Sequence, residues 1–361
     1  MKKIVFFISS AATGGGIQRS ASMITSELDK EEKYSITVVS LYNYDKRKYD
    51  YGKNTKHLKG SIESTNNAKK IIYKAKQECR NLFLNLEFDS IIIEGLGLIP
   101  FIPKKILRNK AINKIVRDHT GYSNFKKYGL TWFGLKMSLK YMDRIIVLTK
   151  ENLLEYSQLF SKYRDKFMVI PNTVSSNIKR FSYNSNNKKI CFIGRLSNEK
   201  GPDMAIEAFS KVLNVNEYSE WKLDLYGTGP MLNYLKSIVH DKKLERNVFF
   251  KGYESNIKDI YNKYAFLLVS SKFESFGLVI LEALKAGIPV VSFDCNYGPR
   301  SLIKDGENGL LVTNGDKEEL SKAIYSLISN ENLRNQLAKN TDQIDSEFDY
   351  FKVITKWENV I

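Results

Sequence analysis

Residues 274–282 read ESFGLVILE and follow the apolar run YAFLLVS at 264–270. The apolar run predicts a buried strand, and the apolar pattern that continues after the loop predicts a helix. A helix that begins here presents the backbone N–H groups of Phe276, Gly277 and Leu278, which form a seat for a phosphate group. The stretch therefore predicts the strand, loop and helix unit of an α/β fold, with an anion at the helix start.

Two glutamates lie at the ends of this stretch. Glu274 precedes the predicted helix and Glu282 lies about two turns inside it, so the pair can bracket an extended ligand whose anionic centre sits at the helix start. A nucleotide diphosphate sugar has this shape. Glutamates near a helix start also act as caps and favour the helix dipole, so their spacing alone leaves a purely structural role open.

A second phosphate-binding pattern lies in the string CFIGRLSNEKG at 191–201. A strand is expected to end at Gly194, the following loop carries Arg195 and Lys200, and a helix is expected to begin near Pro202. Arginine offers a planar fork of donors and lysine a compact charge, and both can neutralise a leaving diphosphate. The loop therefore predicts a second set of contacts to the same ligand.

The strings FIGRLSNEKG at 192–201 and IPVVSFDCNYGPRSLIKDGENGLLV at 288–312, together with the two spaced glutamates, resemble glycosyltransferase family 4. Its members are retaining transferases of the GT-B fold, and the resemblance covers nearly the whole chain. It implies two Rossmann-like, doubly wound parallel-sheet domains that face a central cleft. The chain departs from many relatives at Ser275, where they carry Gly, and at Ser301, where they carry an acid.

Strands and helices alternate along the whole chain, which favours parallel sheets with helices on both faces. The expected domains are 1–175 on the acceptor side and 188–345 for the nucleotide sugar, with 346–361 as a terminal helix that crosses back in the family. Strands are expected near 3–9, 35–42, 89–94, 112–118, 143–149, 166–170, 188–194, 221–227, 246–251, 264–270, 288–293 and 309–312. The terminal helix should bury a stripe formed by Phe348, Phe351, Ile354, Trp357, Val360 and Ile361.

The first domain contributes a glycine loop and a histidine to the expected site. The resemblance places Gly15 and Gly16, followed by a helix at 17–28, beneath the donor and near the acceptor. His119 follows the strand expected near 112–118, at the edge where open α/β sheets bind ligands. A lone histidine is usually a structural residue, but the resemblance implies that this one contacts the transferred sugar.

The resemblance also implies roles for the second domain. Arg195 and Lys200 would stabilise the departing diphosphate, Glu274 would bind sugar hydroxyls, and Glu282 would bind the ribose. Tyr253 either packs on the base or belongs to the core. The sequence contains no Asp-x-Asp, so we expect no metal and no cofactor. No second carboxylate is placed as a nucleophile, so the resemblance implies a front-side attack in which the leaving phosphate accepts the proton. A UDP-sugar is the expected donor.

Basic residues are concentrated in the first half of the chain. Residues 1–180 hold 33 Lys and Arg against 16 Asp and Glu, whereas 181–361 hold 23 against 24. This distribution suits an anionic membrane surface or a lipid-linked glycan acceptor, and the segment FKKYGLTWFGLKMSLKY at 125–141 mixes lysines with aromatic residues. A generally lysine-rich proteome is the simpler explanation, although it leaves the neutral second half unexplained.

The sequence has no apolar run of about 18 residues, and its three cysteines lack metal-ligand spacing. We therefore expect a bacterial cytoplasmic protein on the inner face of the plasma membrane, acting in capsule, lipopolysaccharide or teichoic acid assembly. Two other classes stay open. A nucleotide-sugar epimerase would need more acids and histidines, and a nucleic-acid-binding protein would show a recognition motif that this chain lacks.

Overall fold

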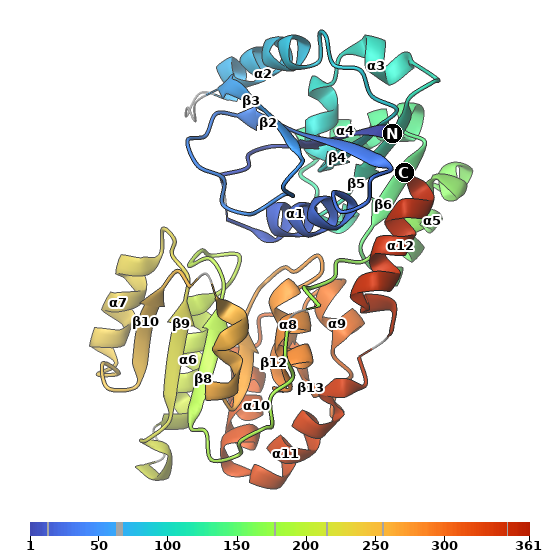
Figure 1. Cartoon of the computed structure of the whole chain (residues 1–361). Helices are drawn as coiled ribbons and strands as arrows, with labels where there is room; N and C mark the ends of the chain where they lie inside the picture. Colours follow the sequence, from blue (N-terminus) through green and yellow to red (C-terminus); the bar gives the residue numbers. More distant parts are fainter. Residues whose placement is uncertain (13, 63–67, 177, 214–215, 255, 345) are drawn as a thin grey trace. The chain divides into compact units, whose positions relative to one another are not determined.

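The computed structural model describes residues 1–361 apart from 13, 63–67, 177, 214–215, 255 and 345. The chain divides into two compact units (Figure 1). The first contains Met1–Thr173 together with Glu347–Ile361, and the second contains Val174–Ser346. Each unit has its own sheet and core.

The first unit is built on a seven-stranded sheet in the order β3-β2-β1-β4-β5-β6-β7. All its pairings are parallel. β1 lies inside the sheet because the chain runs outward from it in both directions. The strands are β1 (Lys2–Ile8), β2 (Tyr34–Tyr42), β3 (Lys56–Ile62), β4 (Ser90–Glu94), β5 (Asn113–Arg117), β6 (Arg144–Val147) and β7 (Phe167–Val169).

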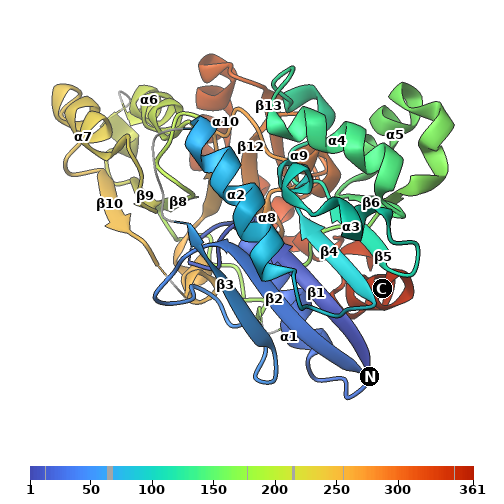
Figure 2. The same ribbon diagram turned by 90° about the horizontal axis from the view of Figure 1, so that it is seen from above.

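Helices cover both faces of this sheet, and α1 and α2 lie on opposite sides of it (Figures 1 and 2). Ile24 of α1 packs with one set of strand residues, and Ala75 of α2 packs with the other. Burial on both faces explains why these strands read as continuous apolar runs. The helices are α1 (Gly16–Leu28), α2 (Ala68–Leu82), α3 (Lys104–Arg108), α4 (Leu130–Tyr141), α5 (Lys150–Leu159), α12 (Tyr350–Val360) and the 3-10 turns η1 (Leu96–Phe101), η2 (Tyr122–Asn124) and η3 (Ser161–Lys166).

Strand β3 is absent from the strands expected from the sequence. It is an edge strand that pairs with β2 alone, so it buries few side chains. Gly60 and Ile62 are its buried residues. Gly60 approaches β2 so closely that a Cβ there would lie 2.2 Å from the carbonyl oxygen of Leu41.

The second unit has a six-stranded parallel sheet in the order β10-β9-β8-β11-β12-β13. All six strands expected in this half of the sequence are present, and the expected α/β fold class is confirmed. The strands are β8 (Lys189–Ile193), β9 (Lys222–Tyr226), β10 (Val248–Gly252), β11 (Phe266–Val269), β12 (Val290–Asp294) and β13 (Gly309–Thr313).

The helices of the second unit form one large core with this sheet. Phe209 of α6, Leu235 of α7 and Ile324 of α10 pack in a single cluster with strand residues such as Phe192 and Leu268. The helices are α6 (Pro202–Leu213), α7 (Leu232–Asp241), α8 (Leu278–Ala286), α9 (Gly298–Leu302), α10 (Lys317–Ser329), α11 (Glu331–Lys339) and the 3-10 turns η4 (Asn216–Tyr218), η5 (Ile257–Asp259), η6 (Tyr261–Lys263), η7 (Asn340–Asp342) and η8 (Ser346–Phe348), the last of which ends in the first unit.

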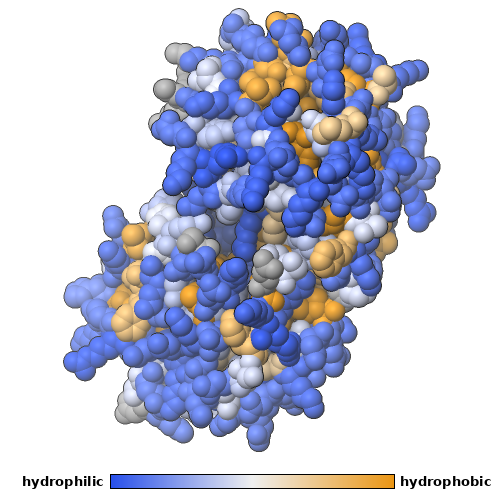
Figure 3. All heavy atoms as spheres, viewed as in Figure 1, coloured by the Kyte–Doolittle hydropathy of each residue, from blue (hydrophilic) through white to orange (hydrophobic). Residues whose placement is uncertain are grey.

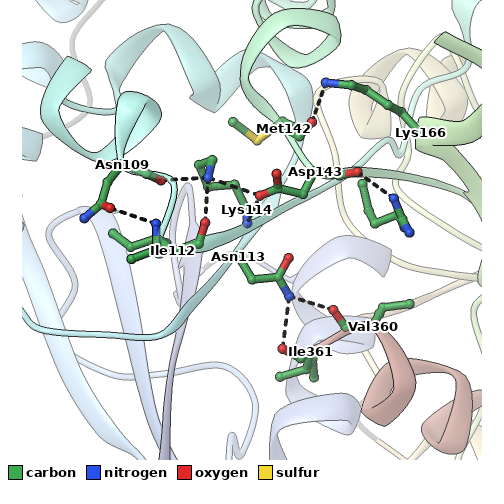
Figure 4. Close-up of polar contacts among 11 residues, drawn as sticks. Asn109, Ile112, Asn113, Lys114, Met142, Asp143, Lys166, Val360 and Ile361 are labelled. Atoms are coloured by element: carbon green, nitrogen blue, oxygen red, sulfur yellow. Dashed lines mark hydrogen bonds and ion pairs between the residues drawn. The ribbon is translucent and has the colours of Figure 1, made fainter.

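Helix α12 belongs to the first unit and packs in the same cluster as α1. Trp357 is fully buried there, whereas Phe351 is 63% exposed, so the expectation that Phe351 lies on the buried stripe is wrong. Val353, two positions further along the helix, lies on the buried face instead. The end of the helix is tied to the sheet through Asn113, whose side-chain amide donates to the carbonyl of Val360 at 2.8 Å (Figure 4).

Candidate active site

The loop before α8 has the form that the sequence predicts. Gly277 caps the helix with φ +85°, and a Cβ at this position would lie 2.8 Å from the Cδ1 atom of Ile280. The positive φ favours glycine at this position. Phe276 and Leu278 on either side of Gly277 are both buried. The first residue of α9 holds the loop in place, because the N–H of Gly298 donates to the carbonyl of Glu274 at 3.1 Å.

Glu274 and Lys200, expected to serve one site, form an ion pair in the structure. The Lys200 Nζ lies 2.6 Å from the Glu274 Oε1, and the hydroxyl of Ser271 donates to the same oxygen at 2.9 Å. Both residues follow the carboxyl ends of neighbouring strands, β8 and β11. Their side chains are 27% and 11% exposed, so the pair lies at a partly accessible edge of the sheet.

Cys295 lies beside this pair and plays no part in the expected chemistry. Burial raises the pKa of its thiol to about 12, and the negative charge of Glu274 acts in the same direction. The thiol is therefore neutral at physiological pH, which makes it a poor nucleophile.

The other expected donor-binding residues of the second unit occupy different environments. Gly194 closes β8, and its N–H donates to the carbonyl of Tyr226 at 3.0 Å. Arg195 is exposed and forms no ion pair with the described residues. Tyr253 follows β10 and is 50% exposed, so the alternative that it belongs to the core is wrong. β10 is two strands away from β8 in the sheet.

Glu282 lies inside the unit rather than on its surface. Its exposed fraction is 0%, and the hydroxyl of Tyr261 donates to its Oε2 at 3.2 Å. Tyr261, in η6, is a partner that sequence reasoning missed. The pattern around it, DIYNKY at 259–264, gives no signal that one of its tyrosines contacts a residue of a later helix.

In the first unit, His119 is held by a buried carboxylate. Its Nε2 lies 2.6 Å from the Oε2 of Glu94, which ends β4. The Nη1 of Arg117 lies 3.6 Å from the same oxygen, and Glu94 and Arg117 are both fully buried. Burial opposes ionisation of Glu94, but the charge of Arg117 and the contact with His119 outweigh it, so the pKa of Glu94 falls below its usual value.

Asp118 fixes the loop that follows His119. Its carboxylate accepts hydrogen bonds from the N–H groups of Thr120 and Gly121, both at 2.9 Å, and from the hydroxyl of Tyr156 at 2.7 Å. Burial nevertheless raises the pKa of Asp118. These contacts determine the backbone path on the carboxyl side of His119.

The glycine loop leads into α1 as expected. Gly15 is the N-cap residue and Gly16 begins the helix. The N–H of Gly15 donates to the hydroxyl of Tyr49 at 3.3 Å. Tyr49 lies in the basic loop after β2, whose Lys48 approaches Gly14: a Cβ on that glycine would lie 3.7 Å from the lysine Cε. Sequence reasoning missed this contact between two loops.

The segment 125–141 is partly core and partly surface. Leu135 and Leu139 of α4 are buried, whereas Tyr128 and Phe133 are 64% and 47% exposed. The ammonium of Lys136 lies 3.7 Å from the ring centroid of Trp132. Figure 3 shows exposed hydrophobic residues among hydrophilic ones on the face of the first unit that it draws.

No helix among the described residues is long and apolar enough to cross a membrane. The same part of the chain contains no group of three or more His, Cys, Asp or Glu side chains that could hold a metal ion.

Comparison with solved structures shows the fold. The structure of S. aureus TarM in complex with Fondaparinux, alpha-GlcNAc-glycerol and UDP matches with a TM-score of 0.82 at 18% identity, and covers 100% of this chain and 99% of that one. WaaG, a glycosyltransferase involved in lipopolysaccharide biosynthesis, matches with a TM-score of 0.80 at 16% identity, and covers 99% of each chain. The two parallel-sheet α/β domains of this chain are those of the GT-B fold.

Comparison of sequences matches the second half of the chain to a family model. Residues 175–344 match the model described as glycosyl transferases group 1. An uncharacterized glycosyltransferase of Haemophilus influenzae is 24% identical over 100% of both chains. The poly(glycerol-phosphate) alpha-glucosyltransferase of Bacillus subtilis is 34% identical over 60% of this chain, which spans 32% of that relative's length.

Proposed function

We propose that this protein transfers a hexose-type sugar from a UDP-sugar to an acceptor hydroxyl, with retention of the anomeric configuration and without a metal ion. The observation that carries the proposal is the Lys200–Glu274 pair at the carboxyl edge of the second sheet, next to the start of α8. A cation and an acceptor of hydroxyl hydrogen bonds, placed 2.6 Å apart, suit a ligand that joins a diphosphate to a sugar.

The proposed mechanism assigns the charge of the leaving diphosphate to Lys200 and Arg195, with help from the N–H groups at the start of α8. Glu274 binds hydroxyls of the transferred sugar, His119 orients that sugar, and Glu282 is the ribose contact. The acceptor hydroxyl attacks the anomeric carbon on the face that the diphosphate leaves, and its proton passes to a phosphate oxygen of the leaving group. No carboxylate nucleophile is needed.

We propose a phosphate-bearing or lipid-linked glycan as the acceptor, in the assembly of a bacterial surface polymer. The net charge of +17 on residues 1–180 supports an anionic acceptor. The names of two relatives support a phosphate-bearing acceptor. One is the B. subtilis enzyme above, and the other is the poly(ribitol-phosphate) alpha-N-acetylglucosaminyltransferase of Staphylococcus aureus. These matches favour transfer over epimerisation.

Direct tests are a panel of UDP-, GDP- and dTDP-sugars, with donor hydrolysis and donor-induced melting shifts as readouts. A UDP-sugar should be hydrolysed slowly and raise the melting temperature, and NMR should show an α-configured product from an α-configured donor. EDTA should leave the rate unchanged. Loss of activity on chelation would reject the metal-independent mechanism, and an inverted product would reject retention.

We further propose that the protein binds the inner face of the plasma membrane through the first unit. The exposed aromatic residues of 125–141, flanked by Lys126, Lys127, Lys136 and Lys140, suit an interface with anionic lipids. Changing the four lysines to Gln should weaken flotation with anionic liposomes and activity on a lipid-linked acceptor, and should spare donor hydrolysis. Failure of the wild type to bind anionic liposomes at low salt would reject the proposal, and a salt-dependent gel shift with DNA would favour nucleic acid instead.

A further inference from the structure

Glu94 ends the apolar strand β4 and is a buried carboxylate in contact with His119, the expected sugar-binding residue of the first unit. Its side chain has an exposed fraction of 0%, and its Oε2 accepts from His119 at 2.6 Å. A carboxylate that is removed from water costs several kcal/mol unless it is paired. Arg117, on the neighbouring strand β5, supplies the compensating charge at 3.6 Å.

We propose that Glu94 is a positioning residue that fixes His119 with the proton on Nε2, so that Nδ1 is the ring nitrogen left to accept a hydrogen bond from a hydroxyl of the bound sugar. This inference rests on the proposed function, because it gives a reason for the placement of His119. The chemistry is that of a carboxylate behind an imidazole, where the hydrogen bond made by one ring nitrogen decides what the other can do.

The arrangement around Arg117 extends the support of His119 to three further segments. The Nη2 of Arg117 donates to the Oδ1 of Asn172, which also accepts from the hydroxyl of Ser20 in α1 at 2.8 Å. The guanidinium lies 5.2 Å from the ring centroid of Trp357 in α12. The ring of His119 is therefore held, through Glu94 and Arg117, by α1, by the segment after β7 and by α12.

Hydrogen bonding in this cluster is incomplete, unlike that of a purely structural ion pair. The Oε1 of Glu94 and the Nε and Nη1 of Arg117 are buried and have no hydrogen-bond partner among the described residues. A buried pair of this kind gives little stability compared with apolar residues of similar size. Unsatisfied buried groups are few in native structures and each calls for an explanation, and here they adjoin the residue expected to bind the sugar.

The first test measures the tautomer of His119 by ¹⁵N NMR at about pH 9, well above the usual pKa of an imidazole. The chain has three histidines, His57, His119 and His240, so the signal of His119 is assigned by its loss in the His119→Gln variant. The proposal requires the proton on Nε2 in the wild type. A proton on Nδ1 would overturn it without any variant of Glu94.

The second test uses Glu94→Gln, which keeps the shape of the side chain and removes its charge. Because an amide can donate as well as accept, the variant should lose the fixed Nε2–H tautomer and lower kcat by about 10- to 100-fold, the effect known for carboxylates that orient metal-bound histidines. The KM for the donor should change less than threefold, and Glu94→Asp should recover part of the rate.

The matched control is Asp143→Asn, which removes the carboxylate partner of Lys114 at the opposite end of β5. It should lower the melting temperature and leave kcat unchanged. A folded Glu94→Gln protein with wild-type kcat, or equal kcat losses in both variants, would overturn the proposal. Wild-type inactivity toward every donor would instead reject the proposed function, and the tautomer measurement would still decide whether Glu94 fixes His119.

Discussion

The two ends of strand β5 each carry a buried cation, and the two cations differ in how completely they are hydrogen-bonded. At the amino end, the ammonium of Lys114 donates to the carbonyls of Asn109 and Ile112 at 2.9 and 2.5 Å and lies 3.1 Å from the carboxylate of Asp143 (Figure 4). Three donors meet three acceptors. At the carboxyl end, Arg117 leaves two of its nitrogens without a hydrogen-bond partner among the described residues.

This difference distinguishes a charge with a structural role from a charge that belongs to the proposed sugar-binding site. The Lys114 cluster is complete without anything else, and its acid, Asp143, is half exposed. The Arg117 cluster is fully buried and adjoins His119. Local rules are satisfied at one end of the strand and violated at the other, and violations of this kind are expected at functional sites.

The largest effect should come from Arg117→Met, which leaves the carboxylate of Glu94 buried with His119 as its remaining partner. The free energy of unfolding of the first unit should fall by about 3–5 kcal/mol. Lys114→Met should cost about 1 kcal/mol, because Asp143 can be solvated where it stands. Denaturant unfolding in a Trp221→Phe background would measure both, since Trp132 and Trp357 then report on the first unit alone. Equal losses of unfolding free energy in the two variants would contradict the distinction between the two ends of β5.

A test of the second unit is Lys200→Ala. If the Lys200–Glu274 pair serves the reaction, kcat should fall by on the order of 100-fold, or about 3 kcal/mol of transition-state stabilisation, with the melting temperature little changed. The control is Lys317→Ala, which breaks a surface pair with Glu207 in the same unit. Near wild-type turnover in Lys200→Ala would mean that the pair is structural, like that of Lys114.

Glu282→Gln should have a smaller effect, on binding rather than turnover. If the buried carboxylate contacts the ribose, affinity for UDP should fall by about 1–3 kcal/mol, measured by calorimetry. Glu307→Gln, which alters an exposed carboxylate of the same unit, is the control. Unchanged affinity in Glu282→Gln would limit this residue to its hydrogen bond with Tyr261.

The smallest effect is a pH dependence. The pKa of Glu94 is lower in the folded protein than the usual 4.5, so its stabilising contribution is fully present above about that pH and is lost as the pH falls through its folded value. The difference in unfolding free energy between wild type and Glu94→Gln should therefore be constant near neutral pH and shrink below about pH 4.5. A difference that grows with acid would contradict the lowered pKa.

Sequence reasoning succeeded where the information is local. The six strands of the second sheet and the helix start near Gly277 were predicted because apolar runs and turn residues mark them directly. Strand β3 was missed because an edge strand needs few apolar residues. The partners of the site residues were missed because they are distant in sequence: Glu94 lies 25 residues before His119. Its only local sign is a carboxylate that closes an apolar run.

The position of α12 sets the order in which the protein can be completed during synthesis. Residues 174–346 contain the whole of the second unit, so its core can close before α12 is made. The first unit contains Met1–Thr173 but lacks Trp357 until α12 emerges. Until then the apolar surface that α12 covers is exposed to water. Exposed apolar surface makes partly folded chains prone to aggregate. The half of the protein that is made first is thus the half that is finished last.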